Sequence, residues 1–143
     1  MSGTDGTMPP PGPRGPVLIS VCVSCRGPEG SPPEARPGED LLATLRRDVA
    51  ASGADIRVRA VQCLSVCKRP CTVALTGPDR YTYVFGDLDP ATGSAAILEG
   101  ARTFASIEHG YMLWRERPEA LRRGIVARIP PADWDPDDGS HPR

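Results

Sequence analysis

The sequence lacks most of the features that by themselves point to a function. Only one of its 17 basic residues is a lysine, Lys68; it has two histidines, and aromatic residues make up 5% of its 143 residues. The formal net charge of −1 produces no strong field that would attract nucleic acid or an anionic membrane. No apolar run approaches the roughly 18–20 residues needed to cross a bilayer. We therefore expect neither nucleic acid nor a membrane as a partner.

A catalytic constellation is missing as well. The histidines, His109 and His141, have no obvious Ser, Cys or carboxylate partner, so a capping or surface role explains them better. Asp87 and Asp89 in "GDLDP" could pass for a metal-binding pair, but Asp89 is better explained as a helix cap. No glycine-rich phosphate loop occurs. Whether the protein is an enzyme stays open at this point, and these absences favour an electron carrier or a metal-binding protein.

The two ends of the chain differ in composition from its middle. Residues 1–16 hold five prolines and four glycines, and residues 132–143 are acidic and polar. Such segments bury too little apolar surface to order themselves, so we expect both to be disordered. The N-terminal segment has no charged-then-apolar secretory pattern. We expect a cytoplasmic protein with one folded domain, residues 17–131, in which thiols stay reduced.

Hydrophobic periodicity within this domain predicts alternating strands and helices. The predicted strands are 17–23, 55–63, 72–76 and 81–86, the predicted helices 37–52 and 89–108, and residues 111–131 form a covering segment with a short helix after Pro118. The order is β-α-β followed by β-β-α, in which the first unit makes a parallel pair. The sequence therefore predicts a small thioredoxin-like α/β domain with a mixed four-stranded sheet and flanking helices.

Against this background the five cysteines stand in two groups. "CVSC" holds Cys22 and Cys25, and "CLSVCKRPC" holds Cys63, Cys67 and Cys71. The predicted first and third strands can be neighbours, so the loops that carry the two groups can converge at one end of the sheet. A C-x2-C pair and a C-x3-C pair would supply four thiolates, the number that zinc or an iron–sulfur cluster takes.

Two other uses of these thiols remain open. A zinc-binding interaction or metal-handling module would use the same four ligands, although zinc knuckles prefer the shorter spacing in both pairs. A thiol-disulfide oxidoreductase would use Cys22 and Cys25, but it needs that pair at a helix N-terminus. A proline-rich loop separates Cys25 from the helix that begins near Pro37. Some cysteines can also be plain buried side chains.

Several stretches of the sequence resemble a bacterial family of predicted metal-binding proteins of unknown function. They are CLSVCKRPCTVAL, RPGEDLLATL, YTYVFGDLDP, WRERP and ARIPP, and the resemblance covers about residues 17–131. That family is itself similar to the thioredoxin-like 2Fe-2S ferredoxins, in which two ligands follow the first strand and a C-x3-C pair supplies the other two. The resemblance implies a ferredoxin-type 2Fe-2S cluster, used in electron transfer or redox sensing, with ligands Cys22, Cys25, Cys63 and Cys67.

The resemblance leaves Cys71 as a fifth thiol, which could be an alternative ligand, a resolving thiol or a buried residue at the start of the third strand. Arg26, Lys68 and Arg69 flank the proposed ligands and would stabilise thiolates. We expect an unidentified redox protein as partner, with a homodimer as a further possibility. Because the two loops have few apolar residues, we also expect metal removal to disorder Cys22–Arg36 and Cys63–Cys71.

Overall fold

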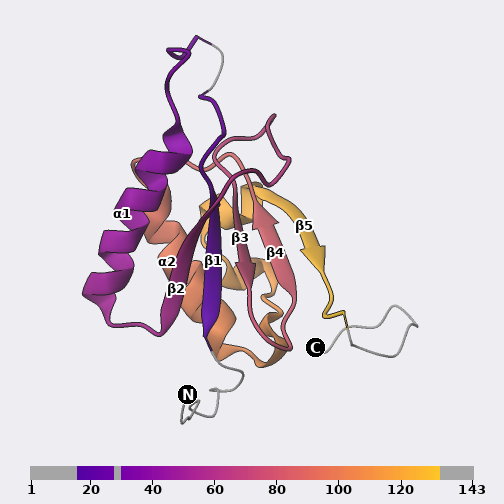
Figure 1. Ribbon diagram of the computed structural model, residues 1–143. Coiled ribbons are helices and arrows are strands. Elements are labelled where there is room, and N and C mark those ends of the chain that lie inside the picture. Colours follow the sequence, from indigo (N-terminus) through magenta and orange to yellow (C-terminus); the bar gives the residue numbers. More distant parts are fainter. Residues whose placement is uncertain (1–15, 28–29, 133–143) are drawn as a thin grey trace.

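The computed structural model describes residues 16–27 and 30–132, so the segments expected to be disordered lie outside the described residues except for Pro16 and Ala132. Figure 1 shows a sheet with helices packed on it. The elements are β1 (Val17–Cys22), α1 (Pro37–Ser52), β2 (Ile56–Val61), β3 (Val73–Thr76), β4 (Thr82–Phe85), α2 (Gly93–Ser106), the 3-10 turns η1 (Glu108–Gly110) and η2 (Trp114–Glu116), α3 (Glu119–Arg123) and β5 (Ile125–Ile129). None of the helices within these residues is long and apolar enough to span a membrane.

The sheet is mixed, with strand order β2-β1-β3-β4-β5. β1 runs parallel to β2 and antiparallel to β3, and the two remaining pairings are antiparallel. The predicted parallel pair, the neighbouring first and third strands and the hairpin are thereby confirmed. The predicted number of four strands is wrong, because β5 adds a fifth at the edge next to β4. Its sequence, "IVARI", alternates only weakly between apolar and polar residues, which is why the sequence predicts a covering segment there.

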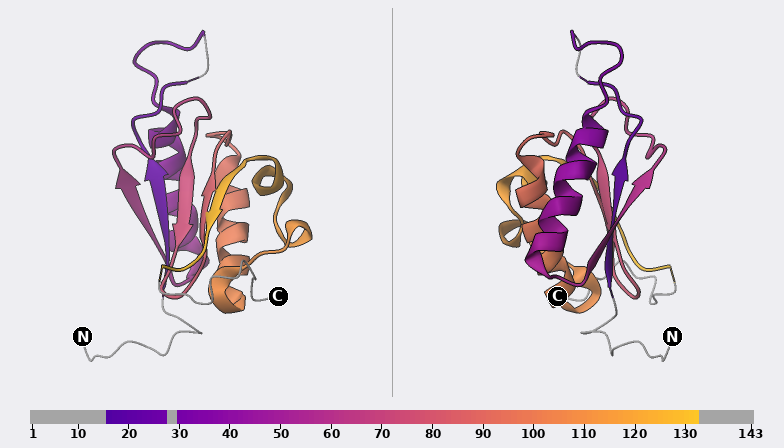
Figure 2. Two further views of the ribbon diagram at one scale, coloured as in Figure 1. Left: turned by 90° about the vertical axis from the view of Figure 1, so that its right-hand side faces the viewer. Right: turned by 60° about the vertical axis from the view of Figure 1, so that its left-hand side comes forward.

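Both long helices lie on the same face of the sheet (Figure 2). α1 buries a stripe at helical spacing, and α2 buries a second one. The core that they form with the strands includes the fully buried Val17, Ile19, Val21, Leu41, Leu45, Leu75, Ile97 and Phe104. Each such side chain contributes about 1.5–3 kcal/mol when it leaves water. Burial against the helices therefore holds β1 and β3 in place. The cysteine loops adjoin the end of β1 and the start of β3.

The helix boundaries follow local sequence signals. α1 begins with Pro37 in its first turn, and Gly53 ends it in the left-handed conformation with φ 70°, as proline and glycine at these places predict. α2 begins at Gly93, later than expected, because Asp89 caps the preceding turn instead of the helix. Its Oδ1 accepts hydrogen bonds from the N–H groups of Ala91 at 2.7 Å and Thr92 at 3.2 Å.

Gly38, in the first turn of α1, lies directly against the end of β1. A Cβ atom at this position would overlap the carbonyl oxygen of Cys22 and lie 3.0 Å from its carbonyl carbon. We expect Gly38→Ala to lower the free energy of unfolding by about 1–3 kcal/mol, because backbone on both sides cannot yield cheaply. Urea unfolding measures this effect.

Gly93→Ala is the matched control, because it makes the same change in the first turn of α2. A Cβ there would meet Leu88 Cβ at 3.4 Å, an ordinary contact, so its unfolding midpoint should stay the same or rise. Equal midpoints for the two variants would contradict the close packing of α1 against Cys22.

Candidate metal centre

The two cysteine loops lie at the same end of the sheet: the first follows β1, and the second connects β2 to β3, the two neighbours of β1. Cys22 is the last residue of β1 and pairs in parallel register with Val61, the last residue of β2. Its N–H donates to Thr72 O at 3.0 Å, just before β3, and the N–H of Val23 donates to Val61 O at 3.0 Å. Because β1 lies between β2 and β3, the segment from Gln62 to Thr72 must pass this end of β1. The expected convergence of the loops therefore follows from the topology.

The first pair, Cys22 and Cys25, is already assembled. Their Sγ atoms lie 3.2 Å apart, within hydrogen-bond distance, and both are free thiols with exposed fractions of 1% and 3%. The residues between them turn the chain directly after β1, so that both sulfurs face the same place. The C-x2-C spacing thus brings the two sulfurs close together, as a chelating pair requires.

The electrostatics of this pair differ between its two sulfurs. Burial by itself would raise the pKa of the Cys22 thiol, but hydrogen bonds from Cys25 and from the backbone at Leu64 and Ser24 hold its pKa below the ordinary value. Burial, followed by the hydrogen bond and the charge of Cys22, raises the pKa of Cys25 to about 12. Cys25 therefore keeps its proton at neutral pH, and a bound cation would displace it.

The second pair, Cys63 and Cys67, lies on the exposed loop that crosses this end of the sheet. The N–H of Ser65, whose φ is 63°, donates to Cys63 Sγ at 3.2 Å. Cys67 is near enough for its charge to raise the pKa of Cys25, and the backbone of Leu64 contacts Cys22. The loop therefore lies over the first pair with its thiols on the solvent side.

The described residues do not bring all four sulfurs together. Within 16–27 and 30–132, no three His, Cys, Asp or Glu side chains are gathered closely enough to hold a metal ion. Cys22 and Cys25 are in contact, whereas Cys63 and Cys67 remain exposed above them. A closed four-sulfur site would need the exposed loop to turn its two thiols inward.

Cys71 differs from the other four cysteines because it belongs to the core. Its exposed fraction is 1%, and its backbone exchanges hydrogen bonds with Leu88, N–H to O at 3.3 Å and O to N–H at 3.2 Å. Burial, followed by the charges of Asp89 and Asp40, raises the pKa of Cys71 to about 11. In this place it is a protonated side chain next to β3.

The other side chains noted in the sequence lie in less suggestive places. His109 lies in η1, with Nδ1 3.1 Å from Asp79 O and 3.5 Å from Asp79 Oδ2, in a turn far along the chain from the cysteines. Lys68 and Arg26 are exposed beside the cysteines. Sequence reasoning missed the backbone N–H donors near the sulfurs and the contacts of Arg69, because both depend on the path of the loop.

Comparison with known proteins agrees with this fold. The structure is similar to that of a thioredoxin-like [2Fe-2S] ferredoxin from Aquifex aeolicus, with a TM-score of 0.54 and 15% sequence identity. The match covers 85% of this chain and 99% of the ferredoxin, and at this identity it shows the thioredoxin-like fold. No curated protein matches the chain. Residues 19–131 match the family described as "Protein of unknown function (DUF1636)". This match takes in most of the chain, so the protein belongs to the DUF1636 family, as the resemblance to a family of unknown function predicted.

Proposed function

We propose that the protein holds a 2Fe-2S cluster through Cys22, Cys25, Cys63 and Cys67 and acts in electron transfer or redox sensing. The observation that carries the proposal is the position of both cysteine loops at one end of the sheet, with the Sγ atoms of the first pair 3.2 Å apart. The similar ferredoxin is described as a [2Fe-2S] protein, which supports the choice of cluster on this fold.

The chemistry of the donor set fits such a group. Four thiols come from two loops, and thiolate sulfur is the ligand that iron–sulfur clusters take. Cys22 has a lowered pKa, which favours its thiolate form, and its immediate neighbour Cys25 has a raised pKa and must release its proton to become a thiolate ligand. Cys63 and Cys67 lie on an exposed loop, where they can turn toward an incoming group without unpacking the core.

The neighbouring groups would influence what the site does. A bound cluster supplies one-electron redox chemistry. Backbone N–H groups donate to sulfur at Cys63 and Cys22, and such hydrogen bonds, together with nearby charge, tune reduction potentials. Lys68 and Arg26 are exposed close to the cysteines, where positive charge favours the thiolate form.

The partner and compartment belong to the same proposal. A 2Fe-2S protein without substrate-binding machinery must exchange electrons with another protein, so we propose an unidentified redox protein as partner. Reduced thiols require a reducing compartment, for which we propose the cytoplasm. A homodimer is a further proposal that gel filtration of the loaded protein would test.

Purification without oxygen tests the proposed function. We expect a brown protein with equal molar amounts of iron and acid-labile sulfide, and an EPR signal that develops when the protein is reduced. Chemical analysis measures the iron and the sulfide, and EPR spectroscopy measures the signal of the reduced protein.

A colourless protein loaded with zinc would overturn the cluster and favour a zinc-binding interaction or metal-handling module with the same ligands. Reduction of a disulfide substrate by the metal-free protein would favour the thiol-disulfide oxidoreductase. We do not expect that activity, because Cys22 and Cys25 are almost completely buried and a bulky disulfide cannot reach either sulfur.

A further inference from the structure

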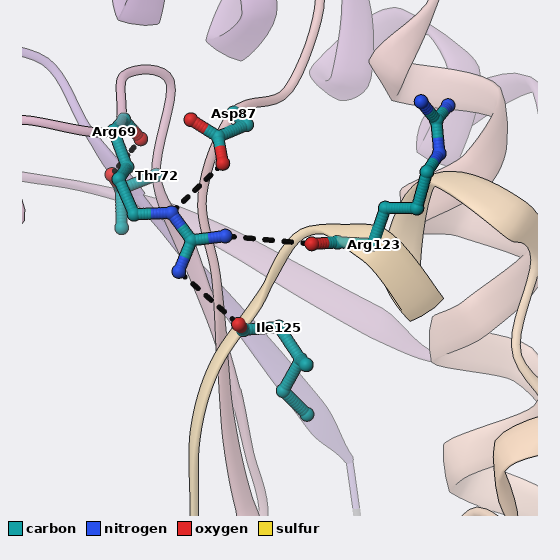
Figure 3. Close-up of polar contacts among 5 residues, drawn as sticks. All are labelled: Arg69, Thr72, Asp87, Arg123 and Ile125. Carbon is teal, nitrogen blue, oxygen red and sulfur yellow. Dashed lines mark hydrogen bonds and ion pairs between the residues drawn. The ribbon is translucent and has the colours of Figure 1, made fainter.

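Arg69 lies in the second cysteine loop, between Cys67 and Cys71, and its side chain leaves the loop to contact two other segments. Its Nε donates to Asp87 Oδ2 at 2.8 Å, Nη1 donates to Ile125 O at 3.2 Å and Nη2 to Arg123 O at 3.4 Å (Figure 3). The guanidinium therefore binds three acceptors at once, which the single ammonium group of lysine could not reproduce. We call Arg69, Asp87 and the carbonyl groups of Arg123 and Ile125 the Arg69 anchor.

The backbone of Arg69 strengthens the same attachment. Its carbonyl oxygen accepts hydrogen bonds from the N–H of Asp87 at 2.9 Å and from Thr72 Oγ1 at 3.1 Å. Its N–H donates to Val66 O at 3.0 Å, which closes the turn that contains Cys67. The turn around Cys67 and the side-chain contacts of Arg69 therefore share one residue, so that moving the anchor moves the turn.

Two glycines allow the three segments of the anchor to approach so closely. A Cβ atom at Gly86 would lie 2.7 Å from Arg69 O, and one at Gly124 would lie 2.5 Å from Gly86 O. The N–H of Gly86 donates to Gly124 O at 2.7 Å. Because these contacts are backbone against backbone, the segment at Arg69 has little freedom to shift relative to β4 and β5.

We infer that Arg69 is a positioning residue, which holds the turn around Cys67 within reach of Cys22 and Cys25 by joining the loop to the α3–β5 junction. The inference rests on the proposed function. A lone ion pair of Arg69 and Asp87, with exposed fractions of 34% and 53%, would contribute little at the surface. The two further side-chain contacts to carbonyl groups and the three hydrogen bonds of the Arg69 backbone are what make the attachment specific.

Two measurements on Arg69→Ala test this inference. In the metal-free protein, we expect faster hydrogen exchange at the amides of Asp87 and Cys71, which bond to Arg69 O and Leu88 O. The amide of Gly86 bonds to Gly124 O and should keep its protection as an internal reference. In a titration with Zn²⁺ against a coloured chelator, we expect about 10- to 100-fold weaker binding, the usual range for residues that orient metal ligands.

Arg102→Ala is the matched control, because it removes an exposed arginine on α2, outside both cysteine loops, and leaves the anchor intact. Its zinc affinity and exchange rates should remain close to those of the wild type. Arg69→Lys keeps the charge but not the three contacts of the guanidinium. We expect its zinc affinity to fall nearly as far as that of Arg69→Ala. It also serves if the alanine variant does not fold.

Equal zinc affinity in Arg69→Ala and the wild type, or an equal loss in Arg102→Ala, would overturn the inference alone. Unchanged exchange at Asp87 and Cys71 would do the same, because it would show that Arg69 does not hold the loop. A wild type that takes up neither zinc nor iron overturns the proposed function, and the inference falls with it.

Discussion

Replacing Cys25 by serine is expected to leave the protein without iron, acid-labile sulfide or visible colour. The serine side chain is similar in shape to that of cysteine, but its hydroxyl does not ionise at neutral pH. The cluster therefore loses one of its four thiolate ligands. Cys25 also lies 3.2 Å from Cys22, and its loss removes the one assembled pair. The same result is expected for serine at Cys22, Cys63 or Cys67, measured by iron and sulfide content and by absorption spectroscopy.

Cys71→Ala is the control for these variants. Cys71 belongs to the core and is 1% exposed, so its removal should leave a small cavity that costs about 1 kcal/mol of stability while iron and colour remain. Alanine is preferable to serine here, because a buried hydroxyl without a partner would add its own penalty. Loss of the cluster in Cys71→Ala, with retention in Cys63→Ser or Cys67→Ser, would mean that Cys71 is the ligand.

The parts of the fold that the sequence predicted well are those with strong local signals. α1 has Pro37 at its start, Gly53 at its end and a buried stripe between them, all of which can be identified within one window of the sequence. β1 is a short β-branched run, and the hairpin of β3 and β4 surrounds a turn with Gly and Pro. In each of these elements the local preference and the tertiary packing agree.

β5 was missed because its stability comes from pairing and not from its own sequence. Ile129 pairs with Thr82 and Ala127 with Val84, contacts that join residues more than forty positions apart. At the edge of the sheet only one neighbour stabilises the strand, and its alternation of apolar and polar residues is weak. Nothing within "IVARI" distinguishes such a strand from an extended covering segment.

For the candidate site, spacing predicted which cysteines share one end of the sheet but not how each is placed. Strand order requires the loops after β1 and β2 to meet, and that much follows from the pattern. The burial of Cys22 and Cys25 beneath an exposed Cys63 and Cys67 depends on the path of the loop. The contacts of Arg69 with Asp87, Arg123 and Ile125 span 18, 54 and 56 positions, and no short motif encodes them.

The second large effect is expected when the metal is removed. Structural zinc contributes an apparent 10–16 kcal/mol, roughly, to small Cys-ligated peptides, and a whole domain is stable by only about 5–15 kcal/mol. In the described part of the first loop, residues 24–27 and 30–36, the backbone hydrogen bonds are local, as from the N–H of Ala35 to Pro32 O. Figure 1 shows this loop rising away from the sheet. Without metal, we expect it to lose its protection against hydrogen exchange.

In the second loop, the structure limits the segment that should lose order when the metal is removed. The sequence led us to expect disorder over Cys63–Cys71, but the Arg69 anchor and the backbone pair of Cys71 and Leu88 do not involve metal. We therefore expect metal removal to expose the amides of residues 62–68. The amides of Cys71 and Asp87, which bond to Leu88 O and Arg69 O, should keep their protection. Mass-spectrometric hydrogen exchange on the metal-loaded and metal-free protein, with α1 and the β3–β4 hairpin as stable references, measures the difference.

The boundary within the second loop is the decisive part of this experiment. If both halves lose protection together, metal binding rather than Arg69 orders the whole loop. If neither loop changes, the cysteines do not form a structural metal site, because a site that joins two loops cannot be emptied without loosening them. A change confined to residues 62–68 and the first loop is expected only if two kinds of contact order the second loop. Metal would then hold the exposed thiols, and Arg69 would hold the residues that follow them.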